Sequence, residues 1–483
     1  MSRTTRHVHL ALGEVASAPE VVDAVVGQIA AGALGDGDWL PATRALAAQT
    51  GLSRGTIVRA YDELAAAGFI ATRAGSGTRV SDGAGQAARA GARTRGRPEP
   101  AEPAPPEPGR ARSPRDLRPG IPDATLVDEK AWRRAVRAAA GASLVGVNPW
   151  EEPSANLWRE LRGHLRRHRG LQAADPLLFD SSRSAVAALC AAFCAEGAIG
   201  AGDGAGGAVA FHHEDPGYRG ALLMAREAGL DVHFHPAEAE GLDAARLGRR
   251  RSIVFVTPAH QYPLGHRMSV ERRVALVRWA RETGSLIIED DYDGEYRYGV
   301  APLPALATLP GAEGHVAYVG TSSKSVAPDL RVAWCVAPEY LRRELRRWLA
   351  VHRRGPSALP AEALAAFIAD GAMNRHLSRA ARVYSDRRAR LVAALRAELA
   401  DEVAEAVEIV GVEAGLHLCV LTPGVDDDAL VEALAGDGWR VRALSSQATR
   451  FAVSGVILNY SRLPGGGARE FAAAFAEHVR ALG

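Results

Sequence analysis

Residues 316–325 read VAYVGTSSKS, a β-rich run that ends in a small polar turn carrying a lysine. The chain holds two lysines, Lys130 and Lys324, although 58 of its 483 residues are Lys or Arg. An amine nucleophile on a side chain must therefore come from one of these two. Lys130 opens a helical segment, where a solvated role is expected. Lys324 follows a strand and precedes Arg331 by seven positions, which favours a functional role.

Similar β-rich runs alternate with helical segments over residues 176–336. The runs are 176–179, 208–211, 231–235, 252–257, 285–289, 316–320 and 330–336. Strands that alternate with helices predict an α/β fold with a mostly parallel sheet. Because ligands bind beyond the carboxyl ends of such strands, the residues that follow each run are candidates for a binding site.

Polar, ionisable and aromatic side chains follow five of these runs. They lie in residues 180–184, 212–218, 258–263, 290–293 and 321–324. Pyridoxal phosphate needs a lysine that can form a Schiff base, a carboxylate for its pyridine nitrogen and a phosphate cup. Asp290 fits the carboxylate, and Tyr292 can donate to the ring hydroxyl. The helix start at 182–184 offers amides to a phosphate, Thr321, Ser323 and Arg331 can complete the cup, and Tyr218 can stack on the ring.

The first 80 residues predict a small helical DNA-binding unit. A glycine-bearing turn at 49–52 separates two short helices, which is typical of a helix-turn-helix, and Ser53 caps the second of them. Two short strands around a glycine turn then indicate a wing. The alternative is a three-helix interaction module with no DNA role. The expected elements are helices over 19–30, 40–47 and 54–67 and strands over 68–70 and 73–80.

Charge placement favours DNA binding over that alternative. The whole chain is nearly neutral, with 58 basic and 56 acidic residues, which excludes a strongly basic protein. Residues 40–80, however, contain five arginines and only two acidic residues. These arginines fall on the second helix, the recognition helix and the wing, the surfaces that meet phosphates and groove edges.

Composition divides the chain into three parts. Residues 81–115 lack large apolar side chains and are rich in Pro and Arg, so they read as a semi-extended linker after a domain at 1–80. Residues 116–483 are long enough for a large subdomain, mainly 116–345, and a smaller α+β subdomain, mainly 346–483.

The N-terminal part resembles the winged helix-turn-helix of the GntR superfamily. The matching segments are 40–44 (LPATR), 51–57 (GLSRGTI), 61–64 (YDEL), 68–70 (GFI) and 75–78 (GSGT). The resemblance implies that Arg44 and Arg54 contact DNA and that Gly75 lets the wing approach the minor groove. The residues expected at the DNA interface are Arg44, Ser53, Arg54, Thr56, Arg59, Arg73, Gly75 and Ser76.

The large part resembles the fold type I aminotransferases over about residues 116–480. The matching segments are 214–218 (EDPGY), 257–263 (TPAHQYP), 289–298 (EDDYDGEYRY) and 320–325 (GTSSKS). The whole chain is identified as a member of the MocR-type regulators, which fuse both kinds of domain, and this implies a homodimer. The resemblance assigns pyridoxal phosphate to Lys324 (Schiff base), Asp290 (pyridine nitrogen), Tyr292 (ring hydroxyl), Tyr218 (stacking) and Ser182, Arg183, Thr321, Ser323 and Arg331 (phosphate).

The chain departs from the family pattern around the substrate pocket. The phosphate turn reads SSRS at 181–184 where relatives usually have GTQQ, residues 148–152 replace a glycine-bearing segment near the entrance, and Leu264 replaces a threonine or serine. The arginine that would hold a substrate carboxylate stays open, with Arg219, Arg450 and Arg462 as candidates.

Three functions fit this sequence. The favoured one is a transcriptional regulator whose cofactor domain senses an amine or amino acid, or the cofactor itself, by exchange at Lys324, and which binds paired operator half-sites on double-stranded DNA. The second is an active aminotransferase with a DNA-binding appendage. The third is a dimerisation scaffold that has lost the cofactor.

Other patterns indicate no metal site and no membrane partner. The cysteines, Cys190, Cys194, Cys335 and Cys419, are scattered, and Cys190 and Cys194 share one helix face, as core residues would. Residues 202–207 (GDGAGG) fit a dinucleotide motif but precede a strand, and the histidines near 212 and 233 lack zinc spacing. Without a signal peptide or a membrane-length apolar run, a soluble cytoplasmic protein is expected.

Overall fold

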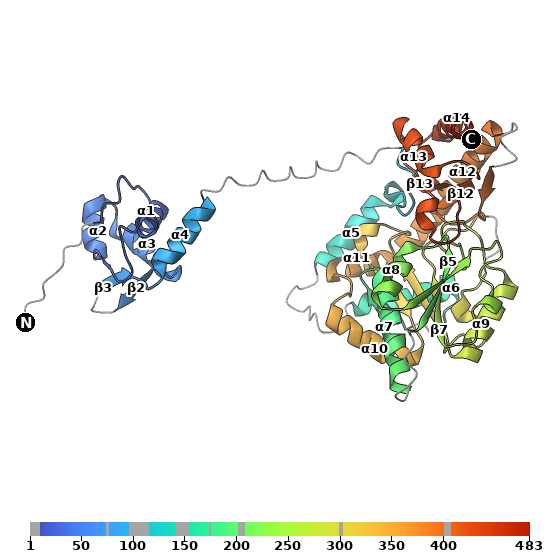
Figure 1. The fold of residues 1–483 in the computed structure, drawn as a ribbon, viewed down its shortest axis with the longest axis horizontal. Coiled ribbons are helices and arrows are strands. Elements are labelled where there is room, and N and C mark those ends of the chain that lie inside the picture. The colour runs from blue at the N-terminus through green and yellow to red at the C-terminus, as the bar shows by residue number, and fades with distance from the viewer. Residues whose placement is uncertain are drawn as a thin grey trace, which may run out of the picture. The chain divides into compact units, whose positions relative to one another are not determined.

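The chain forms two compact units, Met1–Ala111 and Arg112–Gly483, in a computed structural model (Figure 1). The structure describes residues 10–73, 77–95, 115–141, 154–172, 175–200, 208–298, 303–399 and 407–483.

The first unit is a winged helix-turn-helix, as the sequence predicts. Its helices α1 (Ala18–Ala31), α2 (Thr43–Thr50) and α3 (Arg54–Ala66) surround a core that includes Val25, Leu46 and Ile57. Strands β1 (Trp39–Leu40), β3 (Gly77–Val80) and β2 (Ile70–Arg73) pair antiparallel in that order. The wing is therefore the β2–β3 hairpin.

The segment expected to be a linker begins with a helix. Helix α4 (Ala84–Arg95) packs on α1 and buries Ala84 and Ala88 in the core of the first unit. Asp36 fixes its start by accepting hydrogen bonds from the backbone amides of Gly83 and Gly85, at 2.7 and 3.1 Å. The sequence did not predict this helix, because the segment lacks large apolar side chains. Two alanines one turn apart are nevertheless enough for close packing on α1.

The second unit contains a seven-stranded sheet in the order β4-β10-β9-β8-β7-β5-β6. Strand β10 runs antiparallel to both of its neighbours. The other four pairs, β6–β5, β5–β7, β7–β8 and β8–β9, are parallel. Each of the seven runs marked in the sequence contains a strand of this sheet, although β5 continues past the expected end and β10 begins later than expected. The bounds are β4 (Leu177–Phe179), β5 (Ala210–Asp215), β6 (Asp231–Pro236), β7 (Ser252–Val256), β8 (Leu286–Asp290), β9 (Val316–Thr321) and β10 (Ala333–Val336).

Helices cover both faces of the sheet, as is typical of a sheet whose strands are mostly parallel. On one face, α7 (Ser182–Gly200), α8 (Arg219–Glu227) and α10 (Glu339–His352) pack over Phe179, Phe211 and other core residues. On the other face, α9 (Val270–Thr283) packs over the side chains of Val254 and Ile287. Polar residues gather at the carboxyl ends of several strands, although β5 also carries buried polar side chains along its length.

A second, antiparallel sheet has the order β11-β12-β14-β13. Its strands are β11 (Glu408–Val410), β12 (His417–Leu421), β13 (Arg442–Ala443) and β14 (Gly455–Asn459). The helices that share its core are α5 (Glu129–Ala140), α6 (Ala155–Arg169), α11 (Ala358–Ala369), α12 (Ala372–Glu398), α13 (Asp427–Gly436) and α14 (Gly467–Leu482). Among the helices that the structure describes, none has the length and apolar character of a membrane span.

The segment that begins the second unit lies against this smaller sheet. The Leu117 amide donates to the Arg440 carbonyl at 2.8 Å, and the Asn459 amide donates to the Leu117 carbonyl at 2.7 Å. Although residues 116–345 were expected to belong mainly to the large subdomain, their first residues therefore pair with the small one. This pairing carries Gly120 to the carboxyl edge of the seven-stranded sheet.

Candidate functional site

A cavity of about 1030 Å³ opens at the carboxyl edge of the seven-stranded sheet. Its walls come from the segments that follow β4, β5, β7, β8 and β9, as the sequence predicts for a parallel sheet. All nine residues expected to contact a cofactor line it: Ser182, Arg183, Tyr218, Asp290, Tyr292, Thr321, Ser323, Lys324 and Arg331.

Lys324 lies in the wall of this cavity with its amine held by the backbone. Its Nζ donates a hydrogen bond to the Gly120 carbonyl at 2.8 Å. Burial lowers the pKa of Lys324, against the opposing effect of the Asp290 carboxylate. A Cβ on Gly120, whose φ is +102°, would lie 3.2 Å from Nζ, so glycine permits this approach. A lowered pKa favours the neutral amine, the form that attacks a carbonyl.

Asp290 ends β8 beside this lysine. Burial, with the nearby Asp291, raises the pKa of Asp290 to about 7, and the Lys324 charge opposes this. Its buried Oδ1 accepts no hydrogen bond from any residue that the structure describes. A buried carboxylate oxygen without a donor is costly, so a cationic N–H entering the cavity would satisfy it. A pyridinium fits this position, and the donor set therefore suits pyridoxal phosphate.

The acidic residues in segment 290–295, at the end of β8 and just after it, have two different roles. Asp291 forms a buried ion pair with Arg169 of α6, Oδ2 to Nε 2.6 Å, and accepts a hydrogen bond from Tyr318 at 2.8 Å. Glu295 lies 3.5 Å from the same guanidinium. Asp290 and Asp293 instead line the cavity. The alternation lets one half of the motif anchor the loop while the other half faces a ligand.

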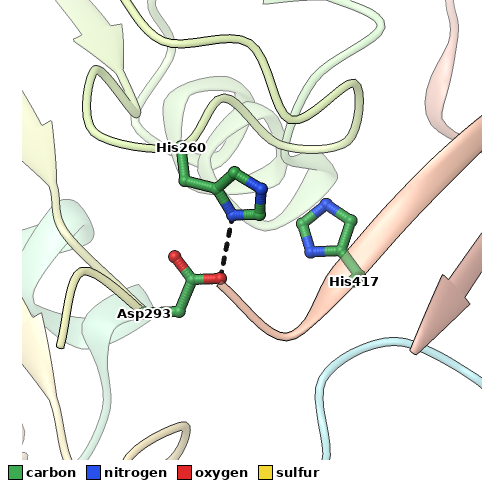
Figure 2. A group of neighbouring side chains, drawn as sticks. All are labelled: His260, Asp293 and His417. Carbon is green, nitrogen blue, oxygen red and sulfur yellow. Dashed lines mark hydrogen bonds and ion pairs between the residues drawn. The ribbon is translucent and has the colours of Figure 1, made fainter. Parts of the chain in front are cut away.

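Tyr292 contacts a histidine rather than open space. Its hydroxyl donates to the His260 carbonyl at 2.9 Å and lies 3.2 Å from His260 Nδ1. His260 Nδ1 and Asp293 Oδ2 are hydrogen-bonded at 3.0 Å, and His417 of β12 lies beside them (Figure 2). Asp293 therefore holds His260 in position, and His260 in turn holds the phenol of Tyr292, which is expected to face the ring hydroxyl of the cofactor.

His260, Asp293 and His417 have the composition of a metal site, with one ligand atom each within 4.8 Å of one another. The sequence, which indicated no metal, did not bring these residues together because they come from three distant segments. Asp293 already satisfies His260 Nδ1, whereas the buried Nε2 of His260 has no hydrogen-bond partner among the described residues. Burial and the neighbouring His260 lower the pKa of His417 well below its usual range, so His417 presents a neutral imidazole to the cavity.

The part of the cavity wall formed by the segments after β4 and β9 is rich in hydroxyls and guanidinium groups. Ser181 caps α7 by accepting from the Ser184 amide at 3.2 Å, and Thr321 donates to the Ser323 hydroxyl at 3.0 Å. Arg331, with a φ of +49°, and Arg354 both pair with the Asp180 carboxylate, at 3.1 and 3.4 Å. A helix N-terminus beside arginines is a good receptor for a phosphate.

Tyr218 is positioned for ring stacking by two neighbours. Its ring lies 6.2 Å from Phe255 in a stacked arrangement, and Arg183 Nε donates to its hydroxyl at 3.3 Å. A Cβ on Gly220 would come within 2.3 Å of the Tyr218 ring, so only glycine leaves this place for it. The second glycine of the EDPGYRG segment is visible in the sequence, but only the fold shows that it makes room for the Tyr218 ring.

The structure brings a different arginine to the cavity from those proposed for a carboxylate. Among the described residues, Arg219, Arg450 and Arg462 are not part of the cavity wall, whereas Arg442 of β13 is. Arg219 instead donates to the Ser446 carbonyl at 3.1 Å. The sequence alone does not point to Arg442 and His417, because both come from the small sheet, whose contact with the strand ends is a tertiary one.

Three of the arginines expected to contact DNA lie on the surface of the first unit, the winged unit. Arg44 of α2 and Arg54 and Arg59 of α3 are exposed, and no ion pair holds them within the described part of the chain. The predicted cap is present: Ser53 Oγ accepts from the Thr56 amide at 3.1 Å. Arg73 ends β2, while Gly75 and Ser76 lie outside the described residues.

Two family descriptions match this chain. Residues 18–80 match "Bacterial regulatory proteins, gntR family", and residues 205–455 match "Aminotransferase class I and II". The HTH-type pyridoxine biosynthesis transcriptional regulator PdxR of Corynebacterium glutamicum is 32% identical over 86% of this chain and 85% of its own length. The probable rhizopine catabolism regulatory protein MocR of Rhizobium meliloti is 32% identical over 87% of this chain and 85% of its own length.

Solved structures share the fold of the large unit. A kynurenine aminotransferase from Pyrococcus horikoshii superposes with a TM-score of 0.66 at 21% identity, covering 76% of this chain and 91% of that protein. The α-aminoadipate aminotransferase LysN of Thermus thermophilus superposes with a TM-score of 0.65 at 23% identity, covering 76% of this chain and 92% of that protein. At these identities the likeness extends to the fold alone.

Proposed function

This chain belongs to the MocR-type transcriptional regulators, which join a GntR-family DNA-binding domain to an aminotransferase-like domain. From that premise we propose that its large unit senses an amine or amino acid through pyridoxal phosphate. The observation that carries the proposal is the cavity that gathers three features. These are the amine of Lys324, the Oδ1 of Asp290, which has no hydrogen-bond partner among the described residues, and a group of hydroxyls and arginines.

When bound, the cofactor supplies an aldehyde that condenses with a primary amine. The residues of this chain divide the work of holding it. Lys324 provides the resident amine, and Asp290 provides the counter-charge for a ring N–H. The remaining contacts are Tyr292 and Tyr218 for the ring and Ser182, Arg183, Thr321, Ser323 and Arg331 for the phosphate.

The effector would enter from the side of the small sheet. Arg442 lies there beside Tyr262, whose pKa burial raises to about 12 while the arginine opposes the shift. A guanidinium pairs well with a carboxylate, so Arg442 is the proposed anchor of an amino-acid effector. The neutral imidazole of His417 lines the same cavity and can hydrogen-bond to the effector.

The winged unit would bind operator DNA as one half of a homodimer in the cytoplasm. Exposed arginines on α2 and α3 suit phosphate and groove contacts, and two copies would occupy paired half-sites. The proposed DNA contacts are Arg44, Ser53, Arg54, Thr56, Arg59, Arg73, Gly75 and Ser76.

The two lysines allow a matched test of the sensor. Lys324→Ala should remove the visible absorbance that a lysine-bound cofactor gives, and should abolish the effect of amines on DNA binding, while DNA affinity without effector stays near that of the wild type. Lys130→Ala, on the exposed start of α5, should change neither. DNA binding is measured by fluorescence anisotropy on the region upstream of the gene, with a panel of amines and amino acids. An amine response retained by Lys324→Ala would refute the sensor.

A complete aminotransferase is the second candidate, because the cavity also holds an arginine for a carboxylate. Sustained production of a keto acid from an amino donor and a keto-acid acceptor would favour this function. A protein that stays colourless after incubation with pyridoxal phosphate would favour the cofactor-free scaffold instead.

A further inference from the structure

Asp180 places a carboxylate among the groups expected to bind the cofactor's phosphate. It follows β4, and its Oδ2 lies 3.1 Å from Arg331 Nη2 and 3.4 Å from Arg354 Nη1. The side chain of Asp180 is 14% exposed, whereas those of the two arginines are 62% and 55% exposed. The carboxylate is thus the less exposed member of each pair.

This carboxylate is held firmly in position. Its Oδ1 accepts hydrogen bonds from the hydroxyls of Ser184, at 2.5 Å, and Ser181, at 3.1 Å. Its backbone amide donates to the Arg354 carbonyl at 2.7 Å. The four residues that bond the carboxylate line the cavity, so Asp180 lies directly behind the proposed phosphate cup.

We propose that Asp180 is an internal anion that competes with the cofactor's phosphate for Arg331 and Arg354 and so weakens cofactor binding. A phosphate monoester carries close to two negative charges at neutral pH, and a fixed carboxylate beside it repels them. The arriving phosphate must also share guanidinium groups that already have a partner. Three arginines (Arg183, Arg331 and Arg354) and one aspartate leave the cup with a net charge of +2 instead of +3.

A weakened phosphate site has a regulatory consequence. Cofactor that exchanges with the free pool lets occupancy follow cofactor concentration, so the regulator would read cofactor supply as well as amines. This inference rests on the proposed function, because it assumes that the Lys324 cavity takes pyridoxal phosphate.

The test compares two ligands that differ only in the phosphate. The cofactor-free protein is titrated with pyridoxal phosphate and with pyridoxal, and visible absorbance reports binding. Asp180→Asn keeps the shape and one acceptor oxygen but removes the charge. It should bind pyridoxal phosphate about tenfold more tightly or better, with pyridoxal affinity unchanged. Asp329→Asn, which removes an exposed carboxylate two residues from Arg331 in the short helix η5 (Pro328–Leu330), should leave both affinities within about twofold of the wild type.

Three outcomes separate the ideas. Unchanged or weaker pyridoxal phosphate binding by Asp180→Asn overturns the competition, and weaker binding shows that Asp180 instead orients Arg331. Failure of the wild type and Asp180→Asn alike to bind either ligand overturns the proposed function. If Asp180→Asn does not fold by circular dichroism, Asp180→Ser removes the same charge while keeping a hydroxyl, and is judged by the same criteria.

Discussion

At the scale of single residues, burial sets the charges inside the cavity. It lowers the pKa of Lys324 and raises the pKa of Asp290 to about 7, so both groups shift towards their neutral forms. Each charge partly offsets the shift of the other. The cavity is therefore prepared for a ligand that brings a carbonyl to the amine and a cationic N–H to the carboxylate.

Asp290→Asn should make the stability of the cofactor-free protein less dependent on pH. The pKa of Asp290 lies above that of the unfolded chain, so the protonated carboxyl contributes stability that is complete below about pH 4 and is lost as the pH rises through about 7. Relative to the wild type, the variant should therefore gain stability over this window, by no more than about 4 kcal/mol. Urea unfolding at several pH values measures the difference.

Asp329→Asn serves as the control, because it makes the same chemical change at an exposed position outside the cavity wall. Parallel profiles for the wild type and Asp290→Asn would contradict the assignment of a neutral Asp290 to the cofactor-free cavity.

At the scale of elements, the end of β5 holds a loop of the small subdomain. Asp215, the last residue of β5, accepts hydrogen bonds from the backbone amides of Thr449, Arg450 and Phe451 at 2.8, 2.6 and 2.9 Å. Gly217 donates to the Gln447 carbonyl at 3.2 Å. The turn that carries Tyr218 is thereby tied to the loop that follows β13 and Arg442. A ligand that touches both sides of the cavity would act on this junction.

Asp215→Ala should loosen that loop. The substitution leaves three amides without their acceptor, and a lost bond to a charged group typically costs about 1.5–3 kcal/mol. Hydrogen exchange should accelerate at residues 445–455 and stay unchanged in β7 and β8. Mass spectrometry of the exchanged protein measures both regions.

Asp231→Ala provides the comparison for the loop, since Asp231 starts β6 and contacts the exposed His233 instead. Equal exchange at residues 445–455 in the wild type and Asp215→Ala would show that the loop is held by other contacts.

At the scale of the whole molecule, the chain that joins the two units needs a starting point. Helix α4 belongs to the winged unit, because Ala84 and Ala88 lie in its core. The segment that can be shortened without cutting into a core therefore begins later than residue 81. The proline-rich residues 99–108 fall in it by sequence.

Deleting residues 99–108 should alter the preferred spacing of DNA half-sites while leaving cofactor binding intact. The deletion shortens the connection between the DNA-binding units of the proposed dimer and a large unit whose cavity it does not touch. Binding to operators with half-sites at graded separations, alongside absorbance titration with pyridoxal phosphate, measures the two effects.

Replacing the same ten residues with Gly and Ser should leave the spacing preference close to that of the wild type, because the length is kept. Equal loss of DNA and cofactor binding in the deletion would contradict a connecting role.

The sequence by itself determined the strands of the large sheet and the residues at their carboxyl ends. Each strand is a local apolar run, and parallel strands necessarily bring their carboxyl ends to one edge. The local pattern is therefore enough to group Asp290, Tyr292 and Lys324 at that edge. The helix-turn-helix was readable for the same reason, since Ser53 caps a helix through residues three positions away.

Only the tertiary structure decided which distant segments complete the site. It brought Gly120 to Lys324, Asp180 to Arg331 and Arg354, and the small sheet's His417 and Arg442 to the cavity. It also showed that α4 packs on α1. These contacts join residues far apart in the chain, and no local periodicity encodes them, because they depend on how whole elements pack against one another.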